Sequence, residues 1–336
     1  MLPKNLSNMR KLRKLEIGSD IYKDINNIED PKLTHMPLGI GELTCLKQLR
    51  LQYVPDPRDA YKANLRSKEN LLSLHLKWPV GVSDVDVDVD VDVDVGIECN
   101  NSKEVLEALK PYANVKQLCI YGYPECLLLP SCLQSLHLYN CPKLKLPTPL
   151  PSSITDLAVG KGNDPSLKSV EKLPNLSVLR ITGFDEVETL PEAPLRNLTR
   201  LRYLDIYDCD KLKTLPTEHG YGGLESTIQR LGIHRCGALE KLIIMGCQEL
   251  EIMLVDFQHL ISLKELELAW LPQLTSLPEE IQHARRLQAL EFEKVARVAA
   301  RASSTNFASR HQLSSRATYK MQGLEPDSPP SSRESC

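Results

Sequence analysis

Residues 201–216, LRYLDIYDCDKLKTLP, contain the pattern on which most of the sequence is built. The first leucine is followed by two variable residues, Leu204, one variable residue and Ile206. Side chains alternate between the two faces of an extended chain, so Leu204 and Ile206 point the same way and the residue between them points the other way. The pattern therefore predicts a short strand with one buried face. Pro216 then predicts an irregular return path, because proline does not continue a sheet or helix.

The same apolar pattern occurs twelve times. The middle leucines are 22 residues apart from Leu157 to Leu179 and 25 apart from Leu179 to Leu204, within the period of about 20–29 residues that is typical of leucine-rich repeats. One such segment cannot bury its leucines alone, but stacked segments form a continuous core. We therefore predict an α/β solenoid, a leucine-rich-repeat horseshoe with a concave parallel β-sheet and an irregular convex side. The twelve patterns begin at Leu12, Leu46, Leu71, Val115, Leu133, Ile154, Leu176, Leu201, Ile228, Leu239, Leu263 and Leu287.

Two of these patterns lie unusually close together. Leu231 and Leu242 are only 11 residues apart, too few for a full coil. Either part of a repeat has been lost, or one of the two segments belongs to the convex side. We expect a structural irregularity at 228–247.

Composition excludes several classes of protein. The 336 residues include 41 Lys and Arg against 44 Asp and Glu, a net charge of −3, which argues against nucleic-acid binding through a basic face. No apolar run approaches the roughly 18 residues that a membrane-spanning helix needs. The first residues lack the charged and then apolar layout of a secretion signal. We expect a cytoplasmic protein with no membrane span and no nucleic-acid partner.

Four cysteines occupy one repeated slot, three residues after the last apolar residue of a strand pattern. Leucine-rich repeats carry Asn or Cys there, bonded to the backbone of the turn. A metal site needs ligands that converge within one turn or loop, whereas these lie on successive repeats, so we predict no metal site. Reduced, buried thiols also fit a cytoplasmic protein. The four are Cys141, Cys209, Cys236 and Cys247.

Three stretches carry a more specific resemblance. They are MPLGIGELTCLKQL at 36–49, ANLRSKENLLSLHLKW at 63–78 and VLEALKPYANVKQL at 105–118. They resemble linked blocks in the repeat region of plant intracellular nucleotide-binding leucine-rich-repeat disease-resistance proteins, and with the other repeats the resemblance covers about residues 1–293. It implies a non-catalytic recognition module in plant defence. The implied partner is a protein: a pathogen effector, a guarded host protein or the family's nucleotide-binding switch domain.

The nucleotide switch of that family is not in this sequence. Its phosphate-binding loop needs the pattern G-x-x-x-x-G-K-S/T, which the chain lacks. The resemblance therefore concerns the repeat region alone, and it implies a fragment of a larger gene or a truncated paralogue. We expect no cofactor. A constitutive intracellular scaffold or ubiquitin-ligase adaptor and a decayed resistance-gene fragment are the alternative functions.

Two segments depart from the repeats. Residues 84–95 alternate Asp and Val. Calcium binding is an alternative for such carboxylates, but the segment has no turn-forming glycine, and we predict a disordered acidic loop inserted into a repeat domain that spans 1–293. In 294–336 leucine nearly vanishes and Ser, Arg, Ala and Pro dominate. That composition offers too little apolar area to offset chain entropy, so we predict a disordered tail.

The outward positions of the strand patterns are the candidate binding surface, because a solenoid sheet projects them onto one shared face. Tyrosine and arginine are common in binding hot spots. The high strand propensity of tyrosine is an alternative explanation for the same residues. Glu265, Glu267, Glu291 and Glu293 are expected to continue the same face. The candidate protein-binding residues are Tyr121, His137, Tyr139, Tyr203, Asp205, Tyr207, Arg230 and His234.

The outward positions of the strands are also the places where a catalytic site would lie. His137, Asp156 and Cys119 are predicted to meet across adjacent strands, with Cys119 in an exposed slot, which resembles a Cys/His nucleophile pair. A reactive thiol needs a sheltered, electropositive pocket, which an open sheet rarely provides. The chain also contains no H-E-x-x-H or G-x-S-x-G motif. We therefore predict no enzymatic activity and no catalytic residues.

Overall fold

The structure is a computed structural model of the 336-residue chain. It describes residues 6–17, 36–52, 57–77, 114–122, 129–141, 149–160, 169–184, 187–190, 195, 198–215, 227–274, 281, 283–295 and 320–322. Most of the repeat region lies within these ranges, while the acidic segment 84–95 lies outside them.

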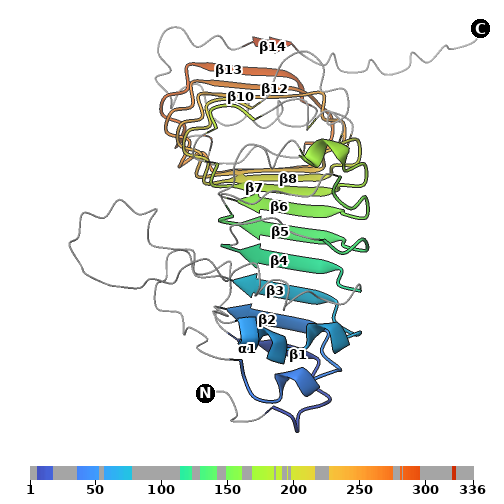
Figure 1. Ribbon diagram of the computed structural model, residues 1–336. Coiled ribbons are helices and arrows are strands. Elements are labelled where there is room, and N and C mark those ends of the chain that lie inside the picture. The colour runs from blue at the N-terminus through green and yellow to red at the C-terminus, as the bar shows by residue number, and fades with distance from the viewer. Residues whose placement is uncertain are drawn as a thin grey trace, which may run out of the picture.

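Stacked parallel strands form a long first sheet (Figure 1), in the order β1-β2-β3-β4-β5-β6-β7-β8-β9-β11. Each coil contributes one strand and then returns to the start of the next. The strands are β1 (Lys14–Glu16), β2 (Gln48–Gln52), β3 (Ser73–Lys77), β4 (Gln117–Tyr121), β5 (Ser135–Tyr139), β6 (Asp156–Gly160), β7 (Val178–Thr182), β8 (Tyr203–Tyr207), β9 (Arg230–His234) and β11 (Ile252–Val255). The short helical segments are η1 (Ile40–Glu42), α1 (Pro57–Lys62), η2 (Leu65–Ser67) and η5 (Ser169–Lys172).

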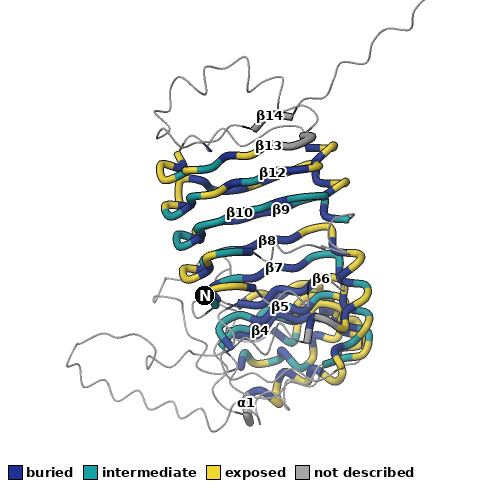
Figure 2. Tube along the Cα trace, turned by 90° about the horizontal axis from the view of Figure 1, so that it is seen from above, coloured by how far each residue is buried: buried dark blue, intermediate teal, exposed yellow. Residues whose placement is uncertain are grey.

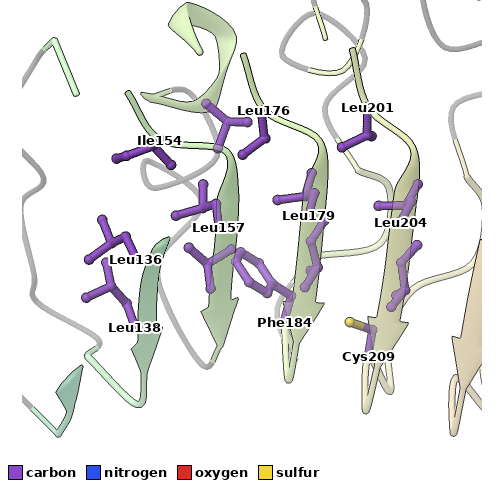
Figure 3. Packing of buried hydrophobic residues seen from close by; sticks show 14 of the residues in the cluster. Leu136, Leu138, Ile154, Leu157, Leu176, Leu179, Phe184, Leu201, Leu204 and Cys209 are labelled. Carbon is purple, nitrogen blue, oxygen red and sulfur yellow. The ribbon is translucent and has the colours of Figure 1, made fainter. Parts of the chain in front are cut away.

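Leucine lies on leucine from coil to coil. Leu157 is in register with Leu179, and Leu179 with Leu204, so the same apolar side chains meet inside every interface (Figure 3). Leu157 and Leu179 are fully buried. Figure 2 shows strands that are largely buried and turns that are exposed at the edges of the coils. The predicted leucine-rich-repeat solenoid with its parallel sheet is confirmed.

The turn after each strand has a repeated geometry. The first residue beyond the strand has a positive φ, and the next residue is often a cysteine. Each of these thiols lies 3.3–3.6 Å from the carbonyl oxygen two residues before it and donates to that oxygen, which confirms the predicted role of the slot. The cysteines are Cys141, Cys209, Cys236 and Cys247, and the residues of positive φ that precede them are Asn140, Asp208, Arg235 and Gly246.

A second parallel sheet begins on the return side of the coils. It has the order β10-β12-β13-β14 and comprises β10 (Lys241–Met245), β12 (Glu265–Leu271), β13 (Ala289–Val295) and β14 (Lys320–Gln322). Isolated bridges join Thr189 to Thr214 and Thr214 to Lys241, so this sheet grows from the return paths of the preceding coils.

The second sheet explains the short spacing at 228–247. β9 and β10 are two sides of one coil, because β9 pairs with β11 in the first sheet while β10 pairs with β12 in the second. Leu231 is in register with Met253, 22 residues later, which is a normal repeat length. No part of a repeat is missing there. Of the two possibilities that the sequence left open, the return-side segment is the correct one.

The expectation that four glutamates continue the first sheet is wrong. Glu265 and Glu267 belong to β12, and Glu291 and Glu293 belong to β13. Both strands are in the second sheet, because the repeat pattern moves from one side of the coil to the other after β9.

The predicted tail, 294–336, is described only at the end of β13 and at β14. The domain boundary at 293 and the disorder of the tail therefore stay predictions.

Lys68 is a fully buried charged residue in the N-terminal part of the core. Its ammonium donates hydrogen bonds to three carbonyl oxygens of the η1 turn, those of Ile40 at 2.9 Å, Gly41 at 3.2 Å and Leu43 at 3.4 Å. Burial disfavours the charged form and lowers the pKa of Lys68 from 10.5 to about 8. The lysine within the 63–78 stretch thus ties two consecutive coils together.

Replacing this lysine tests its role. Lys68→Met removes the three hydrogen bonds that the ammonium donates to the carbonyl oxygens of Ile40, Gly41 and Leu43, and it should lower the free energy of unfolding by about 1–3 kcal/mol at pH 7. Between pH 8 and 10.5 the unfolded wild type binds more protons than the folded one, so its stability rises with pH there and the deficit of the variant widens. Urea denaturation at several pH values measures both effects. Exposed Lys11→Met is the control, and equal pH profiles for Lys68→Met and wild type would contradict the prediction.

Candidate protein-binding surface

The outward positions of strands β4–β9 form three rows that run across the first sheet. Each strand contributes its first, third and fifth residue, and hydrogen-bonded register aligns them from strand to strand. All eight candidate residues lie in these rows. The first row is Gln117, Ser135, Asp156, Val178, Tyr203 and Arg230; the middle row is Cys119, His137, Ala158, Arg180, Asp205 and Gly232; the last row is Tyr121, Tyr139, Gly160, Thr182, Tyr207 and His234.

Asp156 is the centre of a polar network that joins β5, β6 and β7. His137 Nε2 lies 3.2 Å from Asp156 Oδ2, and Ser135 Oγ donates to the same oxygen at 3.3 Å. Arg180 Nη1 donates to Asp156 Oδ1 at 2.8 Å. Burial alone raises the pKa of Asp156, but the hydrogen bond and charge of His137, the charge of Arg180 and the hydrogen bond from Ser135 outweigh it, so the pKa lies below its ordinary value.

Asp205 was expected on the exposed surface, and that expectation is wrong. Its side chain is only 5% exposed because it lies between two arginines and fills the space beside a glycine. Arg180 Nε is 3.8 Å from Asp205 Oδ2, and Arg230 Nη2 is 3.6 Å from Asp205 Oδ1. Within the described residues Asp205 Oδ1 accepts no hydrogen bond. A Cβ on Gly232 would overlap the carboxylate of Asp205.

Tyr207 and His234 form an aromatic pair at the end of β8 and β9. Their ring centroids are 4.7 Å apart and the ring planes differ by 9°, a stacked arrangement. Burial lowers the pKa of His234, which favours the neutral imidazole. Burial and the charge of Asp205 raise the pKa of Tyr207. Both rings are half-buried, so each offers one face to a partner.

Tyr139 and Tyr121 form a second aromatic group on β4 and β5. They are direct cross-strand neighbours. Tyr139 occupies the space that a side chain at Gly160 would need, since a Cβ there would lie 2.8 Å from its ring. Lys77 Nζ lies 5.4 Å from the Tyr121 ring centroid, within cation–π range. The glycine therefore lets one tyrosine lean across the sheet.

Tyr203 is the candidate that projects most into solvent, at 39% exposed. It is the cross-strand neighbour of Arg230, which is half-buried. On the far side of Arg230, Ile252 of β11 is 48% exposed. The first row therefore ends in an apolar, cationic and apolar series.

The Ser135, His137 and Asp156 cluster does not have the geometry of a catalytic relay. A relay uses the two ring nitrogens of histidine separately, one for the nucleophile and one for the carboxylate. Here both Ser135 Oγ, at 3.1 Å, and Asp156 Oδ2 contact Nε2 of His137. Cys119 is 2% exposed rather than in an exposed slot, because larger neighbours cover it, so it does not present the accessible thiol that a nucleophile needs.

No group of three or more His, Cys, Asp or Glu within the described ranges is arranged to hold a metal ion. No described helix is long and apolar enough to span a bilayer.

Three residues of this surface were missed by the sequence reasoning. Arg180 links two carboxylates, and its position between Leu179 and Ile181 marks it as outward-facing, so the pattern held the signal. Gly160 and Gly232 matter because the side chains of Tyr139 and Asp205 occupy the space that a side chain at each glycine would need. No pattern along the sequence predicts that effect.

Comparison with known proteins agrees with this repeat architecture. Residues 40–159 match the family of R13L1/DRL21 leucine-rich repeats. That range contains the stretches 63–78 and 105–118, strands β2–β5 and all of β6 except its last residue. Residues 40–159 therefore carry leucine-rich repeats of that family, and the chain is similar over most of its length to plant disease resistance proteins. The resemblance stated from the sequence is thereby confirmed.

Two relatives come from Solanum bulbocastanum. This repeat chain is 28% identical over 248 residues to the disease resistance protein RGA2, covering 70% of the chain and 21% of the relative. It is 27% identical over 286 residues to the putative disease resistance protein RGA1, covering 74% of the chain and 26% of the relative. The chain thus spans about a quarter or less of each.

Among solved structures, an internalin (inlF) from Listeria monocytogenes is similar with a TM-score of 0.35. The identity is 14%, and the similarity covers 88% of this chain and 85% of the internalin.

The first prediction for this surface concerns Gly232, whose missing side chain leaves room for the Asp205 carboxylate. Gly232→Ala should lower the free energy of unfolding by about 1–3 kcal/mol, because the new methyl group collides with a carboxylate held between two arginines. In an Asp205→Ala background the same change should cost much less. Thermal or urea denaturation measures each cost. Gly237→Ala is the matched control, since its Cβ would meet nothing closer than 3.7 Å. If Gly232→Ala lowered the free energy of unfolding equally with and without Asp205, a collision between the new methyl group and the Asp205 carboxylate would be contradicted.

The Asp156 network makes a separate prediction. Arg180→Ala removes one of the charges that lower the pKa of Asp156, so that pKa should rise. The stabilisation that Asp156 gives is present above its ordinary value of 3.8 and is lost as the pH falls through its folded pKa. In the variant this loss should occur at a higher pH. Carboxyl-detected NMR titration gives the pKa, with exposed Arg286→Ala as the control. An unmoved Asp156 titration would contradict the assignment.

Proposed function

We propose that this chain is a non-catalytic recognition module in plant defence, and that it binds a protein through the outward rows of the first sheet on β4–β9. The observation that carries the proposal is the convergence of four tyrosines and two arginines with the half-buried carboxylate of Asp156 and the buried carboxylate of Asp205 on one face. The relationship to disease-resistance proteins supports the setting in defence.

The surface has the physical properties of a binding site for protein. Tyrosine and arginine contribute large contact areas and directional hydrogen bonds, and they dominate measured hot spots. Arg180 and Arg230 are already held by Asp156 and Asp205. The Tyr207 and His234 rings are fixed against each other. Side chains that are ordered before binding lose less conformational entropy when a partner arrives.

Three kinds of partner fit this proposal: a pathogen effector, a guarded host protein and a nucleotide-binding switch domain of the disease-resistance type. Each would act in the cytoplasm. The two aromatic groups are separated by β6 and β7, where Gly160 and Thr182 leave the last row low. A partner would therefore touch two raised aromatic groups with a polar network between them.

The alternative that the chain is a decayed resistance-gene fragment loses one of the observations that favoured it. The short spacing at 228–247 suggested a damaged repeat, yet β9 and β10 are two sides of an intact coil. An intact core favours a chain that still folds and presents a surface.

The proposal predicts that binding depends on the aromatic groups. Tyr139→Ala combined with Tyr207→Ala should reduce the capture of partner proteins from leaf extract at least tenfold, because truncating a hot-spot residue costs about 2 kcal/mol or more. Quantitative mass spectrometry compares the captured proteins.

Tyr61→Ala is the matched control, since Tyr61 is a tyrosine that is 60% exposed on α1, outside the sheet. Circular dichroism checks that all variants fold. A correctly folded double variant that captures the same proteins as wild type would overturn the proposed surface.

A further inference from the structure

A basic groove crosses the starts of strands β1–β5, away from the aromatic groups. We call it the entry groove and define it by Arg13, Lys47, Leu72, Lys116 and Gln134. Its cavity has a volume of about 440 Å³. A second hollow of about 230 Å³ adjoins it and shares some of its lining residues.

The entry groove is built by the repeat itself. Each of its residues immediately precedes a strand, and the carbonyl oxygen of one accepts a hydrogen bond from the amide of the next. The Lys47 amide is 2.7 Å from the Arg13 oxygen, and the Leu72 amide is 2.9 Å from the Lys47 oxygen. The Lys116 amide is 2.9 Å from the Leu72 oxygen. The side chains therefore follow one another at about the 4.8 Å spacing of neighbouring strands.

Three cations of the groove have no counter-charge among the described residues. The side chains of Arg13, Lys47 and Lys116 make no ion pair within the part of the chain that the structure describes. Glu16, which lines the adjoining hollow, already lies 3.1 Å from Lys14 and 3.6 Å from Arg50. Like charges on neighbouring strands repel each other, so the groove favours an anionic occupant.

On the return side of the same solenoid, the residues that precede the bridges and strands alternate between acids and lysines. Glu188, Lys213, Glu240 and Lys264 follow one another there from coil to coil. Lys213 Nζ lies 2.8 Å from Glu188, and Lys264 Nζ lies 2.9 Å from Glu240. Alternating charges satisfy that row without a partner. Among the residues that the structure describes, the entry groove has no such acid in its row, so its charge is available to another molecule.

An apolar residue lies in the middle of the charges. Leu72 is 39% exposed between Lys47 and Lys116. Exposed amide side chains on the neighbouring positions, including Gln117 and Gln134, supply both donors and acceptors. A ligand that matches these features carries carboxylates on either side of an apolar side chain and has a polar backbone.

We propose that the entry groove binds an acidic peptide segment of a partner protein, with an apolar residue against Leu72 and carboxylates on Lys47 and Lys116. This site is separate from the aromatic rows and does not depend on them. A nucleic acid fits less well, because three isolated cations give few of the phosphate contacts on which such binding rests. The net charge of −3 also opposes a long polyanion.

The test uses the full chain and a fluorescein-labelled peptide, Glu-Glu-Leu-Glu-Glu, in an anisotropy titration. Lys47→Glu with Lys116→Glu should weaken binding about tenfold or more, because like charges then face each other across the interface. Leu72→Ser should weaken it several-fold, as should replacing the leucine of the peptide by serine.

Two controls separate this site from general electrostatics. Arg285→Glu with Arg286→Glu makes the same change of net charge at exposed positions outside the groove and should leave binding within about twofold. The variant with Tyr139→Ala and Tyr207→Ala should also bind the peptide normally. The proposal for the entry groove and the proposal for the aromatic rows can therefore fail independently. If the reversal variant does not fold, Lys47→Gln with Lys116→Gln replaces it, with the same expectation of weaker binding.

Three outcomes would overturn the proposal. They are no measurable binding of the peptide by wild type, an equal loss in the Arg285 and Arg286 control, and displacement of the peptide by an oligothymidylate at equal concentration.

Discussion

The stacking of leucine on leucine between successive coils is the interaction on which this structure depends. A single coil has one short strand and buries almost nothing by itself. When coils stack in register, Leu157, Leu179 and Leu204 exclude water from a shared core while their backbones pair in a parallel sheet. Register and burial reinforce each other, because a shift by one residue would expose every leucine. The outward residues are consequently fixed in rows.

Those rows convert a repeated backbone into a specific surface. Parallel register places Asp156 beside Arg180 and Arg180 beside Asp205, although these residues are about one repeat apart in sequence. Where a row contains a small residue, the neighbour expands into its space, as Asp205 does beside Gly232. Charge pairing and side-chain volume therefore determine together which groups face solvent. The same arrangement makes the entry groove basic, since its successive positions carry Arg13, Lys47 and Lys116 and none of its five defining residues is an acid.

Each coil has two sides, and either side can carry a strand. In the coil of residues 201–216, Pro216 follows the return-side leucines, and Thr214 forms two isolated bridges and no strand. In the next coil the corresponding stretch continues as Leu242, Ile243 and Ile244 without proline. β-Branched residues favour a strand and the missing proline permits one. The full second sheet begins at that coil, so the glutamates of β12 and β13 belong to the second sheet and not to the sheet that carries the aromatic rows.

The sequence by itself determined the repeat, the parallel sheet, the cysteine slot and the outward position of all eight candidate residues. Each of these follows from a local period, which one chain displays directly. Only the tertiary structure decided that β9 and β10 share a coil, that Asp205 and Cys119 are covered, and that Lys68 binds the carbonyls of another coil. Those outcomes depend on which residues become neighbours across coils and on how much space each leaves, and a pattern along the chain contains neither quantity.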